Sequence, residues 1–308
     1  MRESRAIERV RRIAANPAAL GLKDDVALLD GFVLTHDSIA EDVHFLPSDP
    51  PASVGWKLVA VNLSDLAGKG AKPAAALLSL ALSGDDDWDL HFIDGVEAAC
   101  ESYALPLVGG DTIALPRGAA KVFGLTAIGR AGENTPLRSG GQRGDALWLV
   151  GTVGDAAAGL KLLRDDANST GALVDVYRRP VPQLAAGQAL APHAHAMMDV
   201  SDGLLLDASR LAEASGLKAV IDLDALPLSR AFIAERGARR GARLFAATGG
   251  DDYALLAALD PETDPLRLSL PSRTTIARIG TLVADGPLLS IVSGGNPVPL
   301  PKRLGFEH

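Results

Sequence analysis

The sequence predicts an α/β protein of two domains, and three observations lead to that prediction. The chain has 308 residues, about twice the ~150 residues of a typical domain, and 47% of them are apolar, enough to fill a core. Apolar runs typical of strands alternate with helical periodicity in both halves. The polar, glycine-rich segment RAGENTPLRSGGQRGD separates the halves. We therefore place the boundary near Arg138 to Gly141 and expect domains over residues 1–139 and 140–308.

The N-terminal segment predicts a helix rather than a targeting signal. Ile7, Val10 and Ile13 recur at helical spacing, and no apolar h-region accompanies them. Arg-rich beginnings also occur in organelle transit peptides, but Glu3 and Glu8 argue against one. No run approaches the ~20 apolar residues that span a bilayer, so we expect no membrane partner and a cytoplasmic protein.

The rest of the first half predicts a hairpin, two helices and further strands. The apolar runs VALLD and FVLTHD flank a turn at Gly31 and predict a β-hairpin. Residues 53–67 and 86–103 carry helical periodicity, and the run AAALLSLALS between them predicts a buried strand, with a helix as the alternative. The segments LPLVGGDTIAL and AKVFGLTAIGRA predict two more strands.

The second half repeats a strand–turn–helix pattern. ALWLVGTVGDAAAGLKLL predicts a strand, a glycine turn and a helix with Asp155 as its N-cap. AHAMMDVSDGLLLDASRLAEASG predicts the same order, with a helix from about Ser201 to Ser215, Asp202 as a natural N-cap and Gly216 as its end. KAVIDLD, RLFAATGGDDYALLAAL and the stretch after Arg273 predict further strands and turns.

Charge and composition restrict the partners. There are 30 Lys and Arg against 38 Asp and Glu, a net charge of −8, and only 4% of the residues are aromatic. We therefore expect no nucleic-acid partner, because such proteins present basic surfaces and stacking aromatics. The single cysteine, Cys100, excludes an internal disulfide and a cysteine metal cluster.

Carboxylates gather where apolar runs end or a helix turns. These residues are Asp24, Asp25, Asp37, Asp65, Asp111, Asp199, Asp202, Asp251 and Asp252. Each has a structural alternative as a cap, a turn residue or a solvated loop residue. Asp65 differs, because near a helix C-terminus it faces the last carbonyls at a cost of about 0.3–1 kcal/mol. Carboxylates that converge repel one another unless cations lie among them, so the set predicts a metal site.

The residue types favour Mg²⁺ over Zn²⁺. Six scattered histidines, one cysteine and the lack of HExxH or CxxC offer no soft ligand set. Carboxylate oxygens suit Mg²⁺, which commonly bridges protein carboxylates to substrate phosphates. The usual phosphate loops are missing, because GTVGDAAAG lacks the GK[ST] of a P-loop and no GxGxxG opens a helix after a strand. The sequence therefore predicts a magnesium-dependent polyphosphate site of another kind.

Seven motifs, in order between Lys23 and Leu256, resemble the thiamine-monophosphate kinase family. They are KDDVALL, THDSIAEDVHF, WKLVAVNLSDLAGKGAKP, LVGGDT, PLRSGGQRGD, MMDVSDGLLLDASRLAEASG and ATGGDDYALL, with a weaker match in GFEH. The wider superfamily includes aminoimidazole ribonucleotide synthetase, selenophosphate synthetase and a hydrogenase-maturation enzyme. The resemblance implies a PurM-like fold. Its N-terminal ATP- and Mg-binding α/β domain joins across a homodimer into a β-barrel, and its C-terminal α/β domain has a mixed sheet.

The resemblance also implies an activity and a site. The family transfers the γ-phosphoryl group of ATP to thiamine monophosphate, giving thiamine diphosphate and ADP by direct in-line transfer assisted by several Mg²⁺ ions. By motif position, the residues that hold or support metal are Asp25, Thr35, His36, Asp37, Asp65, Asp111, Asp199 and Asp202, and the catalytic ones among them are Asp37, Asp65 and Asp111. The ATP contacts are Gly110, Asp111, Arg138, Ser201 and Tyr103. The substrate contacts are His44, Asp251 and Phe306.

Several of these residues have simpler readings, and the chain departs from the family pattern in three places. His44 could pack beside Phe45, Arg138 could be solvated, Tyr103 could belong to the core, and Phe306 could lie in a frayed terminus. The family usually has Gly in place of Lys23, commonly Glu in place of Asp251, and a shorter run than GDTIALPRG.

Two alternative functions remain: another ATP-dependent enzyme of the superfamily, forming an amidine or selenophosphate, and a non-catalytic metal- or nucleotide-binding module.

Overall fold

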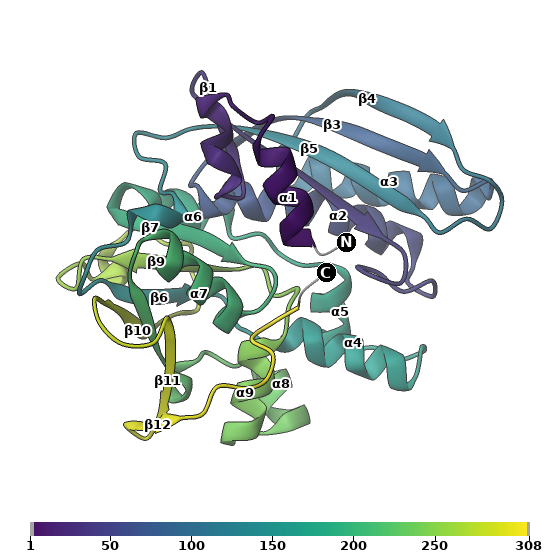
Figure 1. Ribbon diagram of the computed structural model, residues 1–308. Coiled ribbons are helices and arrows are strands. Elements are labelled where there is room, and N and C mark those ends of the chain that lie inside the picture. Colours follow the sequence, from purple (N-terminus) through teal and green to yellow (C-terminus); the bar gives the residue numbers. More distant parts are fainter. Residues whose placement is uncertain (1–2, 307–308) are drawn as a thin grey trace.

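The computed structural model describes residues 3–306 and contains two β-sheets with helices packed against them (Figure 1). The first half comprises α1 (Glu3–Arg11), β1 (Ala27–Leu29), β2 (Phe32–Ala40), α2 (Pro51–Gly68), β3 (Lys72–Leu82), α3 (Asp86–Ser102), β4 (Leu107–Ala114) and β5 (Val122–Arg130). The second half comprises β6 (Ala146–Val150), α4 (Asp155–Asp165), α5 (Ala172–Arg178), α6 (Leu184–Leu190), β7 (Ala194–Val200), α7 (Leu204–Ala214), β8 (Lys218–Asp222), α8 (Arg230–Arg236), α9 (Arg240–Thr248), β9 (Ala254–Leu259), β10 (Ile276–Val283), β11 (Leu289–Ser293) and β12 (Asn296–Val298).

The first sheet has the strand order β1-β2-β5-β3-β4 and two different faces. Helix α2 packs on β2 and β5, and α3 packs on α2. The covered face buries alternate residues such as Val33 and Ile39 of β2 and Leu125 of β5. The other face of the sheet carries exposed side chains, among them His36 and Leu77. Alternation along each strand therefore decides which side chains face α2.

Helix α2 connects the two sheets. Most of its residues from Ser53 onward are buried, including Leu58, Leu63 and Leu66. It packs on β2 and β5 of the first sheet and on β7, β9 and α6 of the second half, and Ala67 and Gly68 in its last turn lie against α6 and β7. Gly68 makes this second contact possible, because a Cβ there would lie 3.0 Å from the backbone nitrogen of Asp199.

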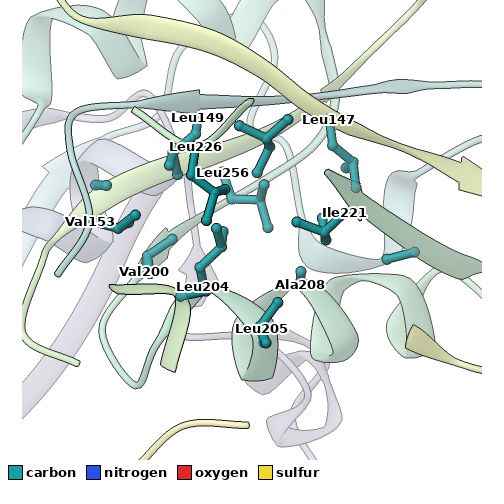
Figure 2. Close-up of a cluster of buried hydrophobic side chains, with 14 of the residues drawn as sticks. Leu147, Leu149, Val153, Val200, Leu204, Leu205, Ala208, Ile221, Leu226 and Leu256 are labelled. Atoms are coloured by element: carbon teal, nitrogen blue, oxygen red, sulfur yellow. The ribbon is translucent and has the colours of Figure 1, made fainter. Parts of the chain in front are cut away.

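The second sheet has the strand order β12-β11-β8-β10-β6-β9-β7. It is mixed, since β8 and β11 run parallel while the other neighbours are antiparallel. Figure 2 shows the apolar cluster that joins this sheet to α7, with Leu147, Leu149 and Leu256 from the strands and Leu204 and Leu205 from the helix. Burying one such side chain contributes about 1.5–3 kcal/mol, so this cluster holds α7, which follows β7, against the sheet.

The structure confirms most predicted elements and corrects four details. The first helix, the hairpin around Gly31, the two long helices and the strand over AAALLSLALS are present. That strand is β3, but it is buried on one face only, with Leu77 40% exposed. The segment before Gly249, predicted as strand and turn, is helix α9. The helices expected to begin with Asp155 and Asp202 as N-caps have Gly154 and Gly203 at those positions.

The two aspartates have other roles. The Asp202 carboxylate pairs with Arg210. Asp155 accepts hydrogen bonds from Thr152 and from Ser229. The N-terminus of α4 is instead satisfied by Asp252, whose two carboxylate oxygens each lie 2.9 Å from the backbone nitrogen of Gly154. None of the helices within residues 3–306 is long and apolar enough to cross a membrane.

Candidate active site

A cavity of about 550 Å³ lies between the two halves of the chain. The predicted site residues that line it are Asp25, Asp37, His44, Arg138, Ser201, Asp202, Asp251 and Phe306. They come from the loop before β1, strand β2, the loops after β2, β5 and β7, the loop before β9 and the C-terminal segment. The tertiary structure thus brings together residues separated by more than two hundred positions.

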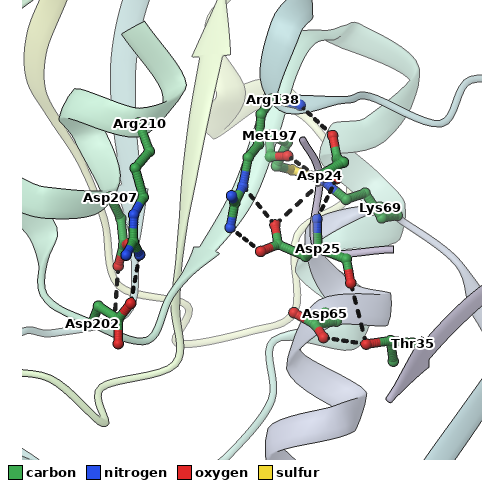
Figure 3. A network of polar contacts seen from close by, with 10 residues as sticks. All are labelled: Asp24, Asp25, Thr35, Asp65, Lys69, Arg138, Met197, Asp202, Asp207 and Arg210. Carbon is green, nitrogen blue, oxygen red and sulfur yellow. Dashed lines mark hydrogen bonds and ion pairs between the residues drawn. The ribbon is translucent and has the colours of Figure 1, made fainter. Parts of the chain in front are cut away.

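Three carboxylates, one partly buried and two buried, form the centre of the site, and Figure 3 shows two of them, Asp25 and Asp65. Oxygen atoms of Asp25, Asp65 and Asp199 lie within 4.8 Å of one another. Asp65 occupies the last turn of α2 and Asp199 lies near the end of β7, so the packing of α2 on β7 brings them together. The Thr35 hydroxyl donates a hydrogen bond to Asp65. This arrangement confirms that Asp65 lies at a helix C-terminus, where a carboxylate is disfavoured.

Two cations reach this cluster from the protein. The Nζ atom of Lys69, which is fully buried, lies 2.7 Å from Asp24 and 3.9 Å from Asp25 and donates to the carbonyl of Met197. Arg138 binds Asp25 through two nitrogens, with Nε 2.9 Å from Oδ2, and its backbone nitrogen donates to Asp24 (Figure 3). Two cations therefore serve four carboxylates: those of Asp24, Asp25, Asp65 and Asp199.

Burial and neighbouring carboxylates both disfavour the charged form of the acids in and around this cluster. Burial, with Asp37 and Asp199 adding to it, raises the pKa of Asp65 well above its usual range. Burial, with the neighbouring Asp199 and Asp202, raises the pKa of Asp37 to about 6. Burial also raises the pKa of Asp207, beside Arg210, to about 7. The charged forms of these acids are thus disfavoured, and a bound cation beside them would relieve that cost.

The donor set fits a hard divalent cation. Asp25, Asp65 and Asp199 offer only carboxylate oxygens, which Mg²⁺ and Ca²⁺ prefer, and no cysteine or histidine belongs to the cluster among residues 3–306. The cluster also borders the cavity, through Asp25 and the neighbouring Asp37, so that a cation there would face a bound ligand.

A second group of contacts surrounds Asp251, which lines the same cavity. Its Oδ2 lies 2.9 Å from Nζ of Lys57, and its Oδ1 accepts a hydrogen bond of 3.0 Å from the Tyr253 hydroxyl. Lys57 also donates to the backbone oxygen of His44 at 2.9 Å. Phe306 donates from its backbone nitrogen to Asp202, which fastens the C-terminal segment beside the same cavity.

Comparison with known proteins places these features in a family. Two family models match in succession: AIR synthase related protein, N-terminal domain, over residues 23–131, and its C-terminal domain over residues 142–291. The thiamine-monophosphate kinase of Escherichia coli O157:H7 is 35% identical, over 99% of this chain and 96% of that protein. The protein of that name from Caulobacter vibrioides is 36% identical, over 95% and 86%. This chain belongs to the thiamine-monophosphate kinase family.

Solved structures agree with the assignment to the thiamine-monophosphate kinase family. The structure described as AaThiL complexed with AMPPCP and TMP matches with a TM-score of 0.84 at 30% identity, over 99% of this chain and 96% of that one. Thiamine-monophosphate kinase from Stenotrophomonas maltophilia K279a matches with a TM-score of 0.74 at 34% identity, over 94% and 95%. Escherichia coli HypE, at 23% identity and a TM-score of 0.72, shares the fold. The expected two-domain PurM-like α/β fold with mixed sheets is confirmed.

Four residues that the family motifs assign to the site lie elsewhere in this chain: His36, Tyr103, Gly110 and Asp111. His36 and Asp37 are neighbours on β2, so their side chains face opposite sides of the sheet, and His36 bonds Thr126 on the open face. Asp111 is exposed on β4, in register with Ser79, three strand spacings or roughly 14 Å from β2. Tyr103 packs edge-on against Trp56, at 5.6 Å between ring centres.

Sequence reasoning predicted Arg138 but missed three other cations and one phenol of the site. Lys57, Lys69, Arg210 and Tyr253 carry no predicted role, yet each contacts a predicted carboxylate or its neighbour. A signal was available for two of them. Lys57 and Lys69 bracket a mostly apolar run in WKLVAVNLSDLAGK, and a lysine in or next to a buried helix needs a partner.

Proposed function

We propose that this protein transfers the γ-phosphoryl group of ATP to thiamine monophosphate, giving thiamine diphosphate and ADP. The observation that carries the proposal is the match over 99% of the chain to a relative complexed with AMPPCP, an ATP analogue, and TMP. The anionic cluster beside the cavity supports it, because a site for two phosphorylated ligands needs cations and this cluster is built to hold them.

The chemistry requires charge neutralisation more than proton transfer. A phosphate monoester has a second pKa near ~6, so its attacking oxygen is largely deprotonated at neutral pH. We propose that Asp25, Asp65 and Asp199, with Asp37, Asp202 and Thr35 beside them, hold Mg²⁺. The bound Mg²⁺ would neutralise the phosphates of both substrates. Arg138 and Ser201 border the same space and would contact ATP.

We assign the part of the cavity lined by His44, Asp251 and Phe306 to thiamine monophosphate. His44, Asp251 and Phe306 line it together, as the family motifs predict for substrate contacts. The ion pair with Lys57 holds the Asp251 side chain there. A carboxylate can accept a hydrogen bond from the aminopyrimidine of thiamine.

We also propose that the protein is a homodimer in which the first sheets join as a β-barrel. Strand β4 is exposed along its whole length, with Leu107, Val108 and Ile113 about half exposed or more. An apolar edge strand of this kind pairs readily with another chain. Asp111 lies about 14 Å from β2 in its own chain. We therefore propose that Gly110, Asp111, Tyr103 and His36 serve at the dimer interface rather than within one chain.

Mixed dimers test this arrangement. Co-expression of an Asp65→Asn chain with an Asp111→Asn chain should restore activity, because one site of each mixed dimer would have both carboxylates if Asp111 acts on the partner's site. Lack of any recovery in purified mixed dimers would mean that Asp111 acts within its own chain. Sedimentation should give about twice 31.9 kDa. A monomer with full turnover would remove the dimer from the proposal.

The domain limits and location follow as proposals. We place the domains at residues 1–139 and 140–308, and the gap between the two matched family models, at residues 132–141, supports this boundary. A cytoplasmic location remains the expectation from the sequence.

An ADP-release assay tests the activity. Thiamine monophosphate, the aminoimidazole precursor and selenide are offered separately with ATP and Mg²⁺. Release of ADP with thiamine monophosphate alone, together with thiamine diphosphate in the product, is the expected result. Turnover with another acceptor would assign a different superfamily activity, and ATP binding without turnover of any acceptor would indicate a binding module.

A further inference from the structure

Lys57 is a buried lysine whose donors are all directed at the protein. Its side chain is 2% exposed, and Nζ lies 2.9 Å from the oxygen of His44, 2.9 Å from Asp251 and 4.1 Å from the centre of the Tyr177 ring. An ammonium group has three N–H donors, and two oxygens and an aromatic face account for them. Lys57 therefore has no donor left for a substrate phosphate, and its role must lie in what it holds.

The two oxygen partners of Lys57 are the residues that we assign to thiamine monophosphate. His44 follows strand β2 in the first half, and Asp251 precedes β9 in the second. A single ammonium thus joins the proposed substrate contacts from both halves of the chain. Tyr253 completes the arrangement, because its hydroxyl donates to the other oxygen of Asp251 at 3.0 Å.

The backbone fixes Asp251 as firmly as its side chain does. Asp251 has a φ of 66°, in the left-handed region, and its backbone nitrogen donates to Ser201 at 2.8 Å. At Gly250 a Cβ would lie 2.8 Å from the same Ser201 oxygen, so only glycine fits. Tyr253 in turn donates from its backbone nitrogen to Val200. A backbone conformation of this cost persists only where surrounding contacts determine it.

We propose that Lys57, together with Tyr253, is a positioning residue that holds Asp251 as a hydrogen-bond acceptor and thereby selects a substrate ring with an amino group. This inference rests on the proposed function. Because both protein neighbours donate to Asp251, its remaining capacity is for accepting a further hydrogen bond. The 4-amino group of the thiamine pyrimidine donates, whereas the 4-oxo analogue presents an acceptor at that position. A site built to bind an N–H group rejects a substrate that lacks it.

The ratio of kcat/KM for thiamine monophosphate to kcat/KM for its 4-oxo analogue, here called the discrimination, measures how well Lys57 and Tyr253 position Asp251. The wild type should prefer the amino compound in kcat/KM by about 10²-fold or more. Lys57→Met should raise KM for thiamine monophosphate by about 10- to 100-fold and reduce the discrimination by about 10-fold, while KM for ATP stays constant. Tyr253→Phe should reduce the discrimination by about 3- to 10-fold, because it removes one neutral hydrogen bond.

Lys121 provides a matched control. Its Nζ lies 2.8 Å from the Glu41 carboxylate and 4.9 Å from the centre of the Trp88 ring, so it too pairs with an acid over an aromatic face. It lines a separate surface cleft with Trp88 and Arg117. Lys121→Met should leave the discrimination unchanged.

A double-mutant cycle separates positioning from a general loss of structure. If Lys57 acts through Asp251, Lys57→Met should add little to the loss of discrimination caused by Asp251→Asn. Additive losses, unchanged discrimination in Lys57→Met, or an equal rise in both KM values would overturn the proposal. If Lys57→Met does not fold, Tyr253→Phe takes its place in the cycle, and its loss of discrimination should likewise add little to that of Asp251→Asn. A wild type that does not phosphorylate thiamine monophosphate would instead refute the proposed function.

Discussion

Two buried lysines, Lys57 within helix α2 and Lys69 directly after its last residue, differ in the number of carboxylates around them. Near the C-terminus of the helix, Lys69 and Arg138 face four carboxylates: Asp24, Asp25, Asp65 and Asp199. Twelve residues earlier, or roughly 18 Å along the axis, Lys57 pairs with Asp251. The adjacent Arg178 pairs with Asp49. The Lys69 end therefore has two cations for four acids, whereas the Lys57 end has two cations for two acids.

The difference shows what each end can bind. At the Asp65 end the protein cations do not balance the acids, and burial, with the neighbouring carboxylates adding to it, raises the pKa values of Asp65 and Asp37. That end is suited to cations from solution and, through them, to phosphates. The Lys57 end is balanced, so it offers directed hydrogen bonds rather than net charge, which suits a heterocyclic ring.

Of the substitutions at the two ends, Asp65→Asn should reduce activity the most. We expect turnover to fall by at least ~10²-fold, the loss typical of removing one key electrostatic stabiliser. Calorimetric titration of the variant with Mg²⁺ should also show weaker binding than the wild type. Turnover within a few-fold of the wild type would show that the unbalanced end is not the metal site.

Asp251→Asn should change substrate affinity rather than the chemical step. We expect KM for thiamine monophosphate to rise by about 10- to 100-fold, because a charged hydrogen bond worth about 1.5–3 kcal/mol is lost. KM for ATP should remain within a few-fold of the wild type. Steady-state kinetics with each substrate varied in turn measure both, and a parallel rise in both constants would contradict the separation of the two ends.

The same kind of substitution should change stability in opposite directions at the two ends. Asp37 has a folded pKa of about 6, above its ordinary 3.8, so its ionisation disfavours the fold. Its contribution to stability falls as pH rises from about 4 to about 6, by about 3 kcal/mol, and stays reduced above that. In EDTA at pH 7.5, Asp37→Asn should therefore raise the unfolding free energy by about 1–3 kcal/mol.

Asp251→Asn under the same conditions should lower the unfolding free energy by about 1–3 kcal/mol, since it leaves the Lys57 ammonium buried without its acid. Thermal melts, at about 2–4 °C per kcal/mol, resolve both changes. Equal signs for Asp37→Asn and Asp251→Asn would disprove the contrast in charge balance.

The smallest effect is expected for Asp251→Glu. The family commonly has Glu at this position, and the flexible side chain of Lys57 can follow a carboxylate that is one methylene longer. We expect KM for thiamine monophosphate to stay within a few-fold of the wild type. A loss as large as that of Asp251→Asn would mean that this chain has adapted its pocket to the shorter acid.

Local patterns in the sequence determined the elements and many of the acids. Helical spacing placed α2 within two residues of its observed ends, the turn at Gly31 placed the β1–β2 hairpin, and the position of Asp65 at a helix end predicted a need for cations. These predictions succeeded because periodicity, turn preferences and helix-end charge depend on neighbouring residues only. The family motifs supplied residue roles that such patterns do not contain.

Only the tertiary structure decided which residues meet. It joined Lys57 to Asp251 across 194 positions and used Asp252 to cap α4 across 98, and neither contact has a local signature. It also placed Asp37 toward α2 and His36 away from it, and left β4 uncovered. Strand alternation fixes that neighbouring residues face opposite sides, but which side is covered depends on where a distant helix packs, and that is set by burial of apolar surface across the whole chain.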